Sequence, residues 1–352
     1  MKFRLTTTRL LPALIAAISC MIFSSQILAA DTANNSLTSQ QPVKRSLCVF
    51  DVVGANGDIF NMMKDYRLDV LQWGVDLQLK AYTDERVASD DFKTGQCDSV
   101  LMTGTRARAY NHFTGTLEAL GAIPSYQELK LILNTLLSPR AAKLMVQDDY
   151  EVVGIMPAGG VYLFVRDRKN DNLSTMAGKR VATLDYDPAS LEMVRQVGAS
   201  VVSSSTTSFA GKFNNGSVDI AYAPAAAYKP LELYHGIKPN GGVINHVVSQ
   251  LNLQMLIRKD LFPEGFGKKS RAHTLKQLDM AFEIILKADQ EIEEEYWITP
   301  PLSSVHKSEL LFRKVRTSLK DNGTYNPKAL AFMKKVRCKV SPAAAECSQK
   351  SD

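Results

Sequence analysis

The sequence predicts an α/β protein that is divided into two lobes. Short apolar runs with strand character alternate with helical patterns along the chain, which is typical of layered α/β folds. The composition, with 45% hydrophobic and 22% charged residues, is that of an ordinary globular protein. A unit in which a helix ends at glycine and an aspartate opens an apolar strand occurs twice, at Lys93–Met102 and Asn214–Tyr222. Two lobes built from the same unit would produce this repeat.

The N-terminus has the three-part layout of a secretory signal peptide. An apolar run at Leu10–Phe23 follows three basic residues, and small residues end the segment at Ala30. The run is shorter than the roughly 20 residues that cross a bilayer. We therefore expect residues 1–30 to be a signal peptide that is cleaved near Ala30, with a retained N-terminal anchor as the alternative. Cys20 is an unfavourable site for lipidation, because the residues before it match a lipobox poorly.

The length of the chain indicates how many lobes it forms, and its net charge excludes some classes of binding partner. Removing residues 1–30 from 352 leaves 322 residues, a length that usually divides into two lobes. The full chain carries 42 basic and 36 acidic residues; the signal peptide contains three basic and no acidic ones, so the net charge falls from +6 to +3. This bias is too weak to indicate binding to nucleic acid or to a membrane surface. Residues 31–45 are polar and predict a disordered leader.

Four cysteines remain after the signal peptide, and an even count in an exported chain favours disulfides. Cys48 lies in the first predicted strand, and Cys97 lies just before another strand of the same lobe. Cys338 and Cys347 lie close together near the C-terminus. Of the three possible pairings, 48–97 with 338–347 is the simplest, and four free thiols are the alternative. The spacings lack the close pairs of a zinc site, so we expect no metal.

The first lobe is predicted to begin with a buried strand that leads through a glycine turn into a helix starting at Asp58. Its further elements are a helix at 84–96 and a long helix at 126–147. The strands expected in this part of the chain are Leu47–Val53, Val75–Tyr82 and Val100–Met102.

The second lobe is predicted to open at a crossover, Pro157–Gly160, between two separate strands. In the series that follows, Asp187 suits a helix N-cap, with Pro188 at the first helical position. Residues 275–319 are predicted to be largely helical, with the acidic Glu291–Glu295 stretch as a solvated face. The strands of this part are Val152–Met156, Val161–Val165, Arg180–Leu184, Ser200–Ser203, Asp219–Tyr222, Val243–Val248 and Leu251–Ile257, with helices at 189–197 and 207–215.

These segments resemble the periplasmic solute-binding proteins of TRAP transporters. The two helix–Gly–Asp–strand units are similar to units of that family. Leu173–Val181 resembles the segment that opens its second lobe, and Gly198–Val202 and Val247–Pro263 resemble later steps in the same order. The resemblance implies a type II periplasmic-binding fold, in which two crossover strands join two lobes around a ligand cleft. A narrower resemblance is to an uncharacterised solute-binding group that is sometimes described as RND-type efflux components.

The resemblance also implies boundaries and partners. Lobe 1 would comprise residues 46–155 plus 250–340, lobe 2 residues 156–249, and a C-terminal tail residues 341–352. The chain would be a periplasmic monomer that captures a small polar or charged solute and delivers it to membrane transporter subunits, without a cofactor and without nucleic acid. One departure is visible: the arginine with which the family usually holds a substrate carboxylate aligns with Ala182, and Arg180 lies two residues earlier. Organic-acid binding therefore does not simply carry over.

In open α/β lobes, ligands bind beyond the carboxyl ends of the strands. The candidate ligand-binding residues selected by this rule and by the crossover are Asn56, Thr103, Thr105, Arg106, Gly159, Asp185, Tyr186 and Tyr222. Arg106, and less strongly Arg108, could pair with an anion, whereas the aspartates near Tyr186 would favour a cationic group. An amino-acid-like solute would suit this mixture. For each residue the alternative is a plain surface or packing role.

An enzyme is not predicted. The sequence lacks G-x-S-x-G, H-E-x-x-H, G-x-G-x-x-G and P-loop motifs. The histidines, which show no metal-ligand spacing, are His112, His235, His246, His273 and His306. The competing function is an accessory or sensor protein of an efflux or signalling complex. A receptor should have a closed cleft with convergent polar groups, whereas an accessory protein should expose a large apolar patch.

Overall fold

The computed structural model describes residues 41–348, in which ten strands form one mixed sheet. The predicted signal peptide lies outside the described residues, as does most of the predicted leader. The strands are β1 (Val43–Phe50), β2 (Val75–Tyr82), β3 (Ser99–Thr103), β4 (Val146–Gln147), β5 (Tyr150–Val165), β6 (Arg180–Leu184), β7 (Ser200–Ser204), β8 (Ile220–Pro224), β9 (Gly242–Arg258) and β10 (Trp297–Ile298).

Ten α-helices accompany the sheet within the described residues. None of them combines the length and the apolar character needed to cross a membrane. They are α1 (Asp58–Leu71), α2 (Glu85–Lys93), α3 (Gly104–Ala107), α4 (Tyr126–Leu137), α5 (Pro188–Gln196), α6 (Phe209–Asn214), α7 (Tyr234–Ile237), α8 (Phe266–Gln290), α9 (Leu302–Asp321) and α10 (Pro327–Val340).

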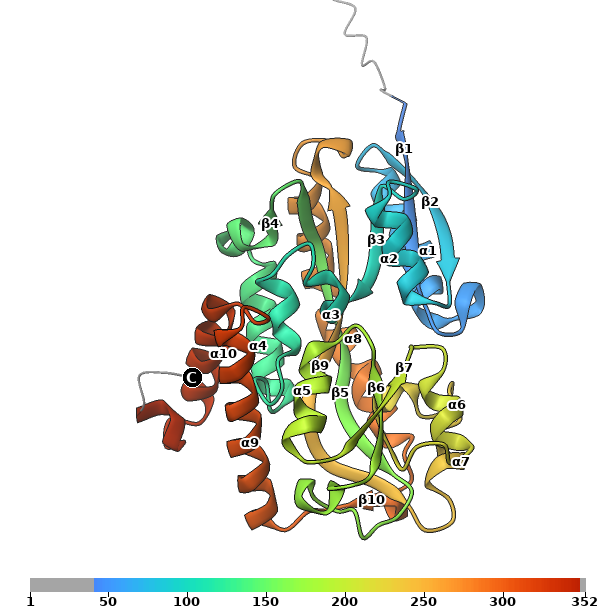
Figure 1. The fold of residues 1–352 in the computed structure, drawn as a ribbon. Helices are drawn as coiled ribbons and strands as arrows, with labels where there is room; N and C mark the ends of the chain where they lie inside the picture. Colours follow the sequence, from blue (N-terminus) through green and yellow to red (C-terminus); the bar gives the residue numbers. More distant parts are fainter. Residues whose placement is uncertain (1–40, 349–352) are drawn as a thin grey trace, which may run out of the picture. The chain divides into compact units, whose positions relative to one another are not determined.

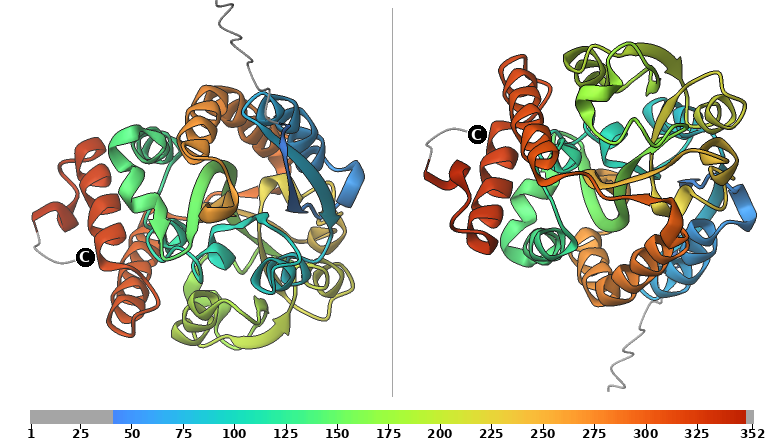
Figure 2. Two further views of the ribbon diagram at one scale, coloured as in Figure 1. Left: turned by 90° about the horizontal axis from the view of Figure 1, so that it is seen from above. Right: turned by 90° about the horizontal axis from the view of Figure 1, so that it is seen from below.

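The strand order is β2-β1-β3-β9-β5-β8-β6-β7, and the two long strands β5 and β9 pair antiparallel at its centre. β1, β2 and β3 are parallel on one side, and β6, β7 and β8 are parallel on the other. Figure 1 shows β1–β3 with α1 and α2 near one end of β5 and β9, and β6–β7 with α6 and α7 near the other end. The views along the vertical axis show α9 and α10 together beside α4 (Figure 2), and α10 contacts α4.

The predicted break at Pro157–Gly160 is wrong, because β5 runs through it as one strand. The register of β5 against β9 shifts between Pro157 and Gly159, and Gly159 has a φ of +101°. A bulge at this point accommodates the missing N–H of proline within a central strand. The two returning strands predicted at 243–257 likewise form one continuous strand, β9.

Three further boundaries differ from the prediction. β1 begins at Val43, so the polar leader ends earlier than residue 45. The helix expected over 126–147 ends at Leu137, because Ser138 is extended before Pro139, and a 3₁₀ segment and β4 follow. The helical region expected at 275–319 is divided into α8 and α9, with a 3₁₀ turn, β10 and two prolines between them.

The repeated helix–Gly–Asp–strand unit has the same geometry in both places. Gly95 and Gly216 each have a φ of +81°, which glycine adopts at little cost. Asp98 then accepts a hydrogen bond from the Ser46 backbone N–H at 2.8 Å, and Asp219 accepts one from the Arg180 backbone N–H at 2.9 Å. Each aspartate thus joins its own strand to the neighbouring parallel strand of the same lobe.

Both predicted disulfides are confirmed. Cys48–Cys97 joins β1 to the segment before β3, and both cysteines are fully buried in the core. Cys338–Cys347 joins α10 to the 3₁₀ turn that follows it. Glu346 reinforces this second link, because its carboxylate accepts hydrogen bonds from Arg337 at 2.6 and 2.8 Å. The described part of the C-terminal tail is therefore attached to α10.

Candidate functional site

A cavity of about 200 Å³ lies between the end of β3 and the start of α5. Its wall comes from both ends of the sheet: Thr103 and Arg108 lie near β3, and Asp187 and Tyr222 lie near β6 and β8. Most lining side chains are apolar, and the charged ones are Arg108, Glu118 and Asp187. Ligand pockets in proteins commonly have this character, although many are larger.

The structure brings half of the predicted ligand-binding residues to this cavity. Thr103, Thr105, Tyr186 and Tyr222 line it. The remaining four do not belong to its lining: Asn56 and Asp185 are exposed, Gly159 lies in the β5 bulge, and Arg106 lies behind Tyr186. Arg108 and Asp187, which the sequence favoured less, are both in the wall.

Arg106 is held by a fully buried carboxylate, Glu85. Its Nε atom lies 3.5 Å from Glu85 Oε2, and its guanidinium lies 3.6 Å from the centre of the Tyr186 ring. Glu85 also accepts hydrogen bonds from the Thr103 backbone N–H at 2.7 Å and from the Tyr186 hydroxyl at 2.8 Å. Burial, followed by the charge of Glu85, raises the pKa of Tyr186 well above its usual value, so Tyr186 stays a donor. The charge of Arg106 is thus neutralised within the protein.

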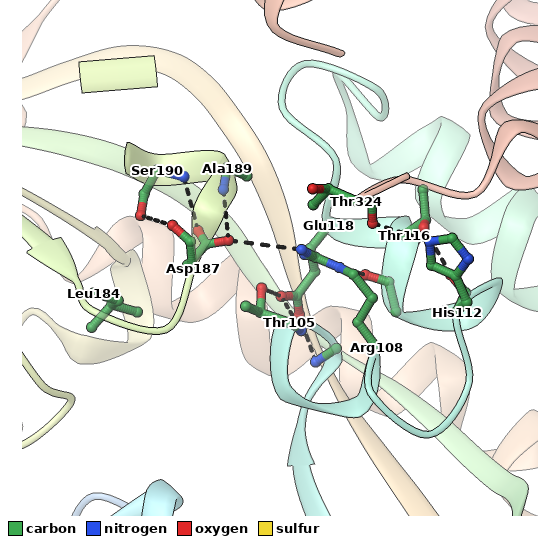
Figure 3. Close-up of polar contacts among 12 residues, drawn as sticks. Thr105, Arg108, His112, Thr116, Glu118, Leu184, Asp187, Ala189, Ser190 and Thr324 are labelled. Carbon is green, nitrogen blue, oxygen red and sulfur yellow. Dashed lines mark hydrogen bonds and ion pairs between the residues drawn. The ribbon is translucent and has the colours of Figure 1, made fainter. Parts of the chain in front are cut away.

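Arg108 and Asp187 point toward one another across the cavity wall (Figure 3). Their charged groups are 3.9 Å apart, and the side chains are only 10% and 13% exposed. Asp187 fulfils its predicted role as N-cap of α5, accepting hydrogen bonds from the backbone N–H groups of Ala189 at 3.2 Å and Ser190 at 3.1 Å. Arg108 donates from Nε to the Gly115 carbonyl at 3.1 Å. Within residues 41–348 its two terminal nitrogens make no hydrogen bond, and Nη1 is the atom that faces Asp187.

Glu118, a buried residue that the sequence analysis missed, lines the cavity from the β3 side. Its carboxylate accepts hydrogen bonds from the backbone N–H groups of Gly104, Thr105 and Asn252 and from the Thr105 hydroxyl, at 2.5–3.0 Å. Burial raises the pKa of Glu118 to about 7, and these hydrogen bonds oppose the rise. Glu118 therefore ties the first turn of α3 to β9. Nothing in its local sequence indicates this, because its partners lie up to 134 residues away.

TRAP solute-binding proteins usually carry a carboxylate-binding arginine at the position that is Ala182 in this chain. Ala182 is buried, and its small apolar side chain forms part of the cavity wall. Arg180 does not take its place, because its guanidinium is exposed and donates to Asp219 at 2.7 Å. Among the described lining residues, Arg108 is the one cationic side chain.

Two other aromatic residues lie outside the cavity lining. Tyr228 is buried against Phe164, outside the cavity lining, and donates to Glu293 at 2.8 Å. His246 stacks on Phe312 and also lies outside the lining. Within residues 41–348, no group of three histidine, cysteine or acidic residues is arranged to hold a metal ion.

A family model described as "Solute-binding protein AdeT 1/2" matches residues 72–352. The chain belongs to this family. AdeT1 of Acinetobacter baumannii, named as a probable solute-binding protein, is 42% identical over 300 residues, which cover 85% of this chain and 99% of AdeT1. AdeT2 of the same species, named likewise, is 24% identical over 233 residues, covering 66% of this chain and 98% of AdeT2. The predicted solute-binding family is thus confirmed.

Solved structures of TRAP periplasmic solute-binding proteins share the fold. One from Ralstonia eutropha, with bound (S)-2-acetolactate, has a TM-score of 0.69 at 12% identity and covers 84% of this chain and 99% of its own. One from Xanthobacter autotrophicus, with bound β-D-galacturonate, has a TM-score of 0.66 at 10% identity, with 84% and 99% covered. These matches confirm the predicted two-lobed α/β fold, and at such identities they show the fold alone.

Proposed function

We propose that the cavity between β3 and α5 is the solute site of this family member, and that the chain delivers its solute to a membrane transporter rather than acting as an enzyme. In this proposal the protein works in the periplasm after cleavage near Ala30. Lobe 1 comprises residues 46–155 and 250–340, and lobe 2 comprises residues 156–249. β5 and β9 are the crossover strands between them.

The observation that carries the proposal is the two-sided wall of the cavity. Thr103 and Arg108 come from lobe 1, and Asp187 and Tyr222 come from lobe 2. A solute that touches both lobes stabilises the closed arrangement, and release requires the lobes to separate. This coupling between occupancy and closure is what a transporter needs in order to recognise a loaded receptor.

Contacts between side chains of the two lobes support a closed state. Tyr186 donates to Glu85 at 2.8 Å and lies under Arg106, and Arg108 faces Asp187 at 3.9 Å. Apolar side chains join the lobes as well, since Met193 of α5 belongs to the same buried cluster as Phe312 of α9. An apolar solute surface in the cavity would add the burial that makes closure stable.

Native mass spectrometry of the mature protein, purified from a periplasm without refolding, tests the proposal. We expect a co-purifying small molecule of defined mass. Ala182→Leu places three additional carbon atoms into the cavity wall and should abolish this adduct. Ala55→Leu, a matched change at an exposed alanine, should keep it. An adduct that persists in Ala182→Leu would place the solute elsewhere and overturn the assignment.

Delivery is tested in cells with the same variants. Cells that lack the protein should take up the labelled co-purified molecule more slowly, and the wild-type chain but not Ala182→Leu should restore uptake. Unchanged uptake in the deletion strain, together with a clean ligand-free mass, would favour the accessory or sensor function.

A further inference from the structure

We infer that the solute is an uncharged molecule with an apolar body, and that this body lies between α5 and the strands of lobe 2. The inference rests on the proposed function, since it names the class of solute that the same cavity binds. The charges in the wall of the cavity compensate one another, whereas the section of the cavity that follows α5 is apolar.

The one cationic side chain among the described lining residues already has partners. Arg108 Nη1 lies 3.9 Å from Asp187 Oδ1, and the Arg108 guanidinium lies 5.1 Å from the centre of the Tyr325 ring. Glu118 lies in the same lining and attracts the same guanidinium electrostatically. An anionic solute group would share this cation with two carboxylates that repel it, and its removal from water would be costly.

The acceptor groups of the wall are occupied as well. The carboxylate of Glu118 receives hydrogen bonds from four donors, and that of Asp187 receives two from the first turn of α5. The Tyr222 hydroxyl accepts from the Leu184 backbone N–H at 3.1 Å. A cationic solute group, such as an ammonium, would compete with these internal donors and would be repelled by Arg108. The wall therefore favours an uncharged solute.

One buried polar group of the lining is left for such a solute. The Thr103 hydroxyl has no hydrogen-bond partner within residues 41–348, although Thr103 is only 7% exposed. A buried hydroxyl without a partner costs free energy, which a polar atom of the solute would recover. Because a hydroxyl both donates and accepts, an alcohol or a carbonyl group can satisfy it without carrying charge.

The rest of the cavity is an apolar space beside α5. Its lining follows this helix from the N-cap, Asp187, to the C-cap, Val197. Val181 and Ile220 are register partners near the amino ends of β6 and β8, so this section extends along the strands away from lobe 1. Its other apolar side chains are Leu163, Leu173, Met176, Met193 and Val194.

The apolar section suits a hydrocarbon better than it suits water or a sugar. Its side chains offer water no hydrogen-bond partners, and an empty apolar cavity lacks dispersion contacts along its walls. A hydrocarbon chain or an aromatic ring would restore these contacts and would itself be removed from water. Sugar hydroxyls placed beside α5 would lose their hydrogen bonds with water without replacement.

Isothermal titration calorimetry of the unliganded mature protein tests the inference with two matched series of probes. One series is hexanol, hexanoate and hexylammonium, and the other is phenethyl alcohol, phenylacetate and phenethylammonium. We expect at least one alcohol to bind with a negative heat-capacity change, and its acid and ammonium counterparts to bind at least about 10-fold more weakly. Glucose, which is neutral but polar, should not bind measurably.

Two outcomes of this titration would overturn the inference. One is an acid or an ammonium that binds as tightly as the corresponding alcohol, because the wall would then tolerate a charge. The other is the absence of binding by both alcohols, because the apolar section would then not take up an uncharged apolar body.

Two variants locate the bound alcohol. Val194→Phe enlarges a side chain on the α5 side of the cavity and should weaken binding at least about 10-fold. Thr103→Val keeps the shape of the side chain and removes the unpartnered hydroxyl, so we expect unchanged or higher thermal stability with about 3- to 10-fold weaker binding. Val201→Phe, at an exposed valine of β7 outside the lining, should bind as the wild type does. Full affinity in Thr103→Val, or in a folded Val194→Phe, would overturn the assignment.

The failure of this inference is distinguishable from failure of the proposed function. A co-purified charged molecule that Ala182→Leu expels would leave the solute site in place and reject the uncharged class. A protein that neither carries a molecule nor binds any of the probes would reject both.

Discussion

The Tyr186 hydroxyl donates a hydrogen bond of 2.8 Å to Glu85, although the two residues are 101 positions apart in the sequence. Glu85 is fully buried at the start of α2, and Tyr186 lies between β6 and α5. The bond therefore links the two proposed lobes directly beside the cavity. Arg106 lies against both partners and neutralises the carboxylate. The three side chains form one polar contact between the two proposed lobes.

We expect Tyr186→Phe to lower the free energy of unfolding by about 1–3 kcal/mol, because it leaves a buried carboxylate with one donor fewer. It should also increase the radius of gyration of the ligand-free protein in small-angle X-ray scattering, since a lobe-to-lobe contact is lost. Tyr234→Phe removes a hydroxyl that contacts Glu232 at the surface and should cost less than about 0.5 kcal/mol. Equal losses in the two variants would show that the Glu85–Tyr186 bond does not stabilise closure.

A tyrosine of α4 forms a hydrogen bond with the backbone of the bulge in β5. The Tyr126 hydroxyl accepts from the Gly160 backbone N–H at 3.0 Å and donates to Asp289 at 2.8 Å. Burial raises the pKa of Asp289, and the hydrogen bonds from Tyr126 and Tyr162 oppose this rise. We expect Tyr126→Phe to destabilise the protein by about 2–4 kcal/mol in urea unfolding, because the backbone N–H of buried Gly160 and the half-buried carboxylate of Asp289 each lose a partner. Tyr162→Phe, whose hydroxyl is 3.4 Å from Asp289, should cost less.

The two disulfides should differ in their contribution to stability. Cys48 and Cys97 are separated by 49 positions, whereas Cys338 and Cys347 are separated by nine. Chain entropy predicts a stabilisation of about 4 kcal/mol for the longer loop and about 2.5 kcal/mol for the shorter one. Urea unfolding of the two double alanine variants measures this difference. A greater loss from removing Cys338–Cys347 would contradict it. Under mild reduction of the native protein, the fully buried Cys48–Cys97 pair should react last.

His246 should make the protein sensitive to acid. Burial against Phe312 lowers the pKa of its imidazole, and the charge of Glu309 opposes this only in part. As the pH falls below about 6.5, the histidine of the unfolded chain is protonated before that of the folded chain, so stability present above this pH is lost. His246→Phe keeps a ring against Phe312 and should reduce the loss of unfolding free energy between pH 7.5 and pH 5.5. His235→Gln, at an exposed position, should follow the wild type, and a wild-type loss in His246→Phe would rule out this origin.

Most of the local structure could be predicted from neighbouring residues. The Asp187–Pro188 helix start lies where it was expected, and so do the glycine helix ends at Gly95 and Gly216. Each depends on interactions over a few positions, which local sequence encodes. The errors concern continuity: proline and glycine at 157–160 predicted a break, whereas pairing with β9 carries the strand through it as a bulge. Tertiary pairing there overrides the local preference.

The same contrast between local sequence and tertiary contacts applies to the candidate site. The rule that ligands lie beyond the carboxyl ends of strands selected Thr103, Thr105, Tyr186 and Tyr222, which line the cavity, but it also selected Asn56, Arg106 and Asp185, which do not. It could not separate Arg106 from Arg108, which are two residues apart and chemically identical. Only the fold decided that Glu85 neutralises the first, while the second keeps its terminal nitrogens at the cavity wall.

Periodicity, spacing and the order of short motifs thus predicted the α/β class, the family and, as the simplest of three possibilities, the disulfide pairing that the structure contains. The tertiary structure decided which charges are paired and which face the cavity. That outcome depends on partners such as Glu85 and Tyr186, or Glu118 and Asn252, which only the folded sheet brings within hydrogen-bonding distance.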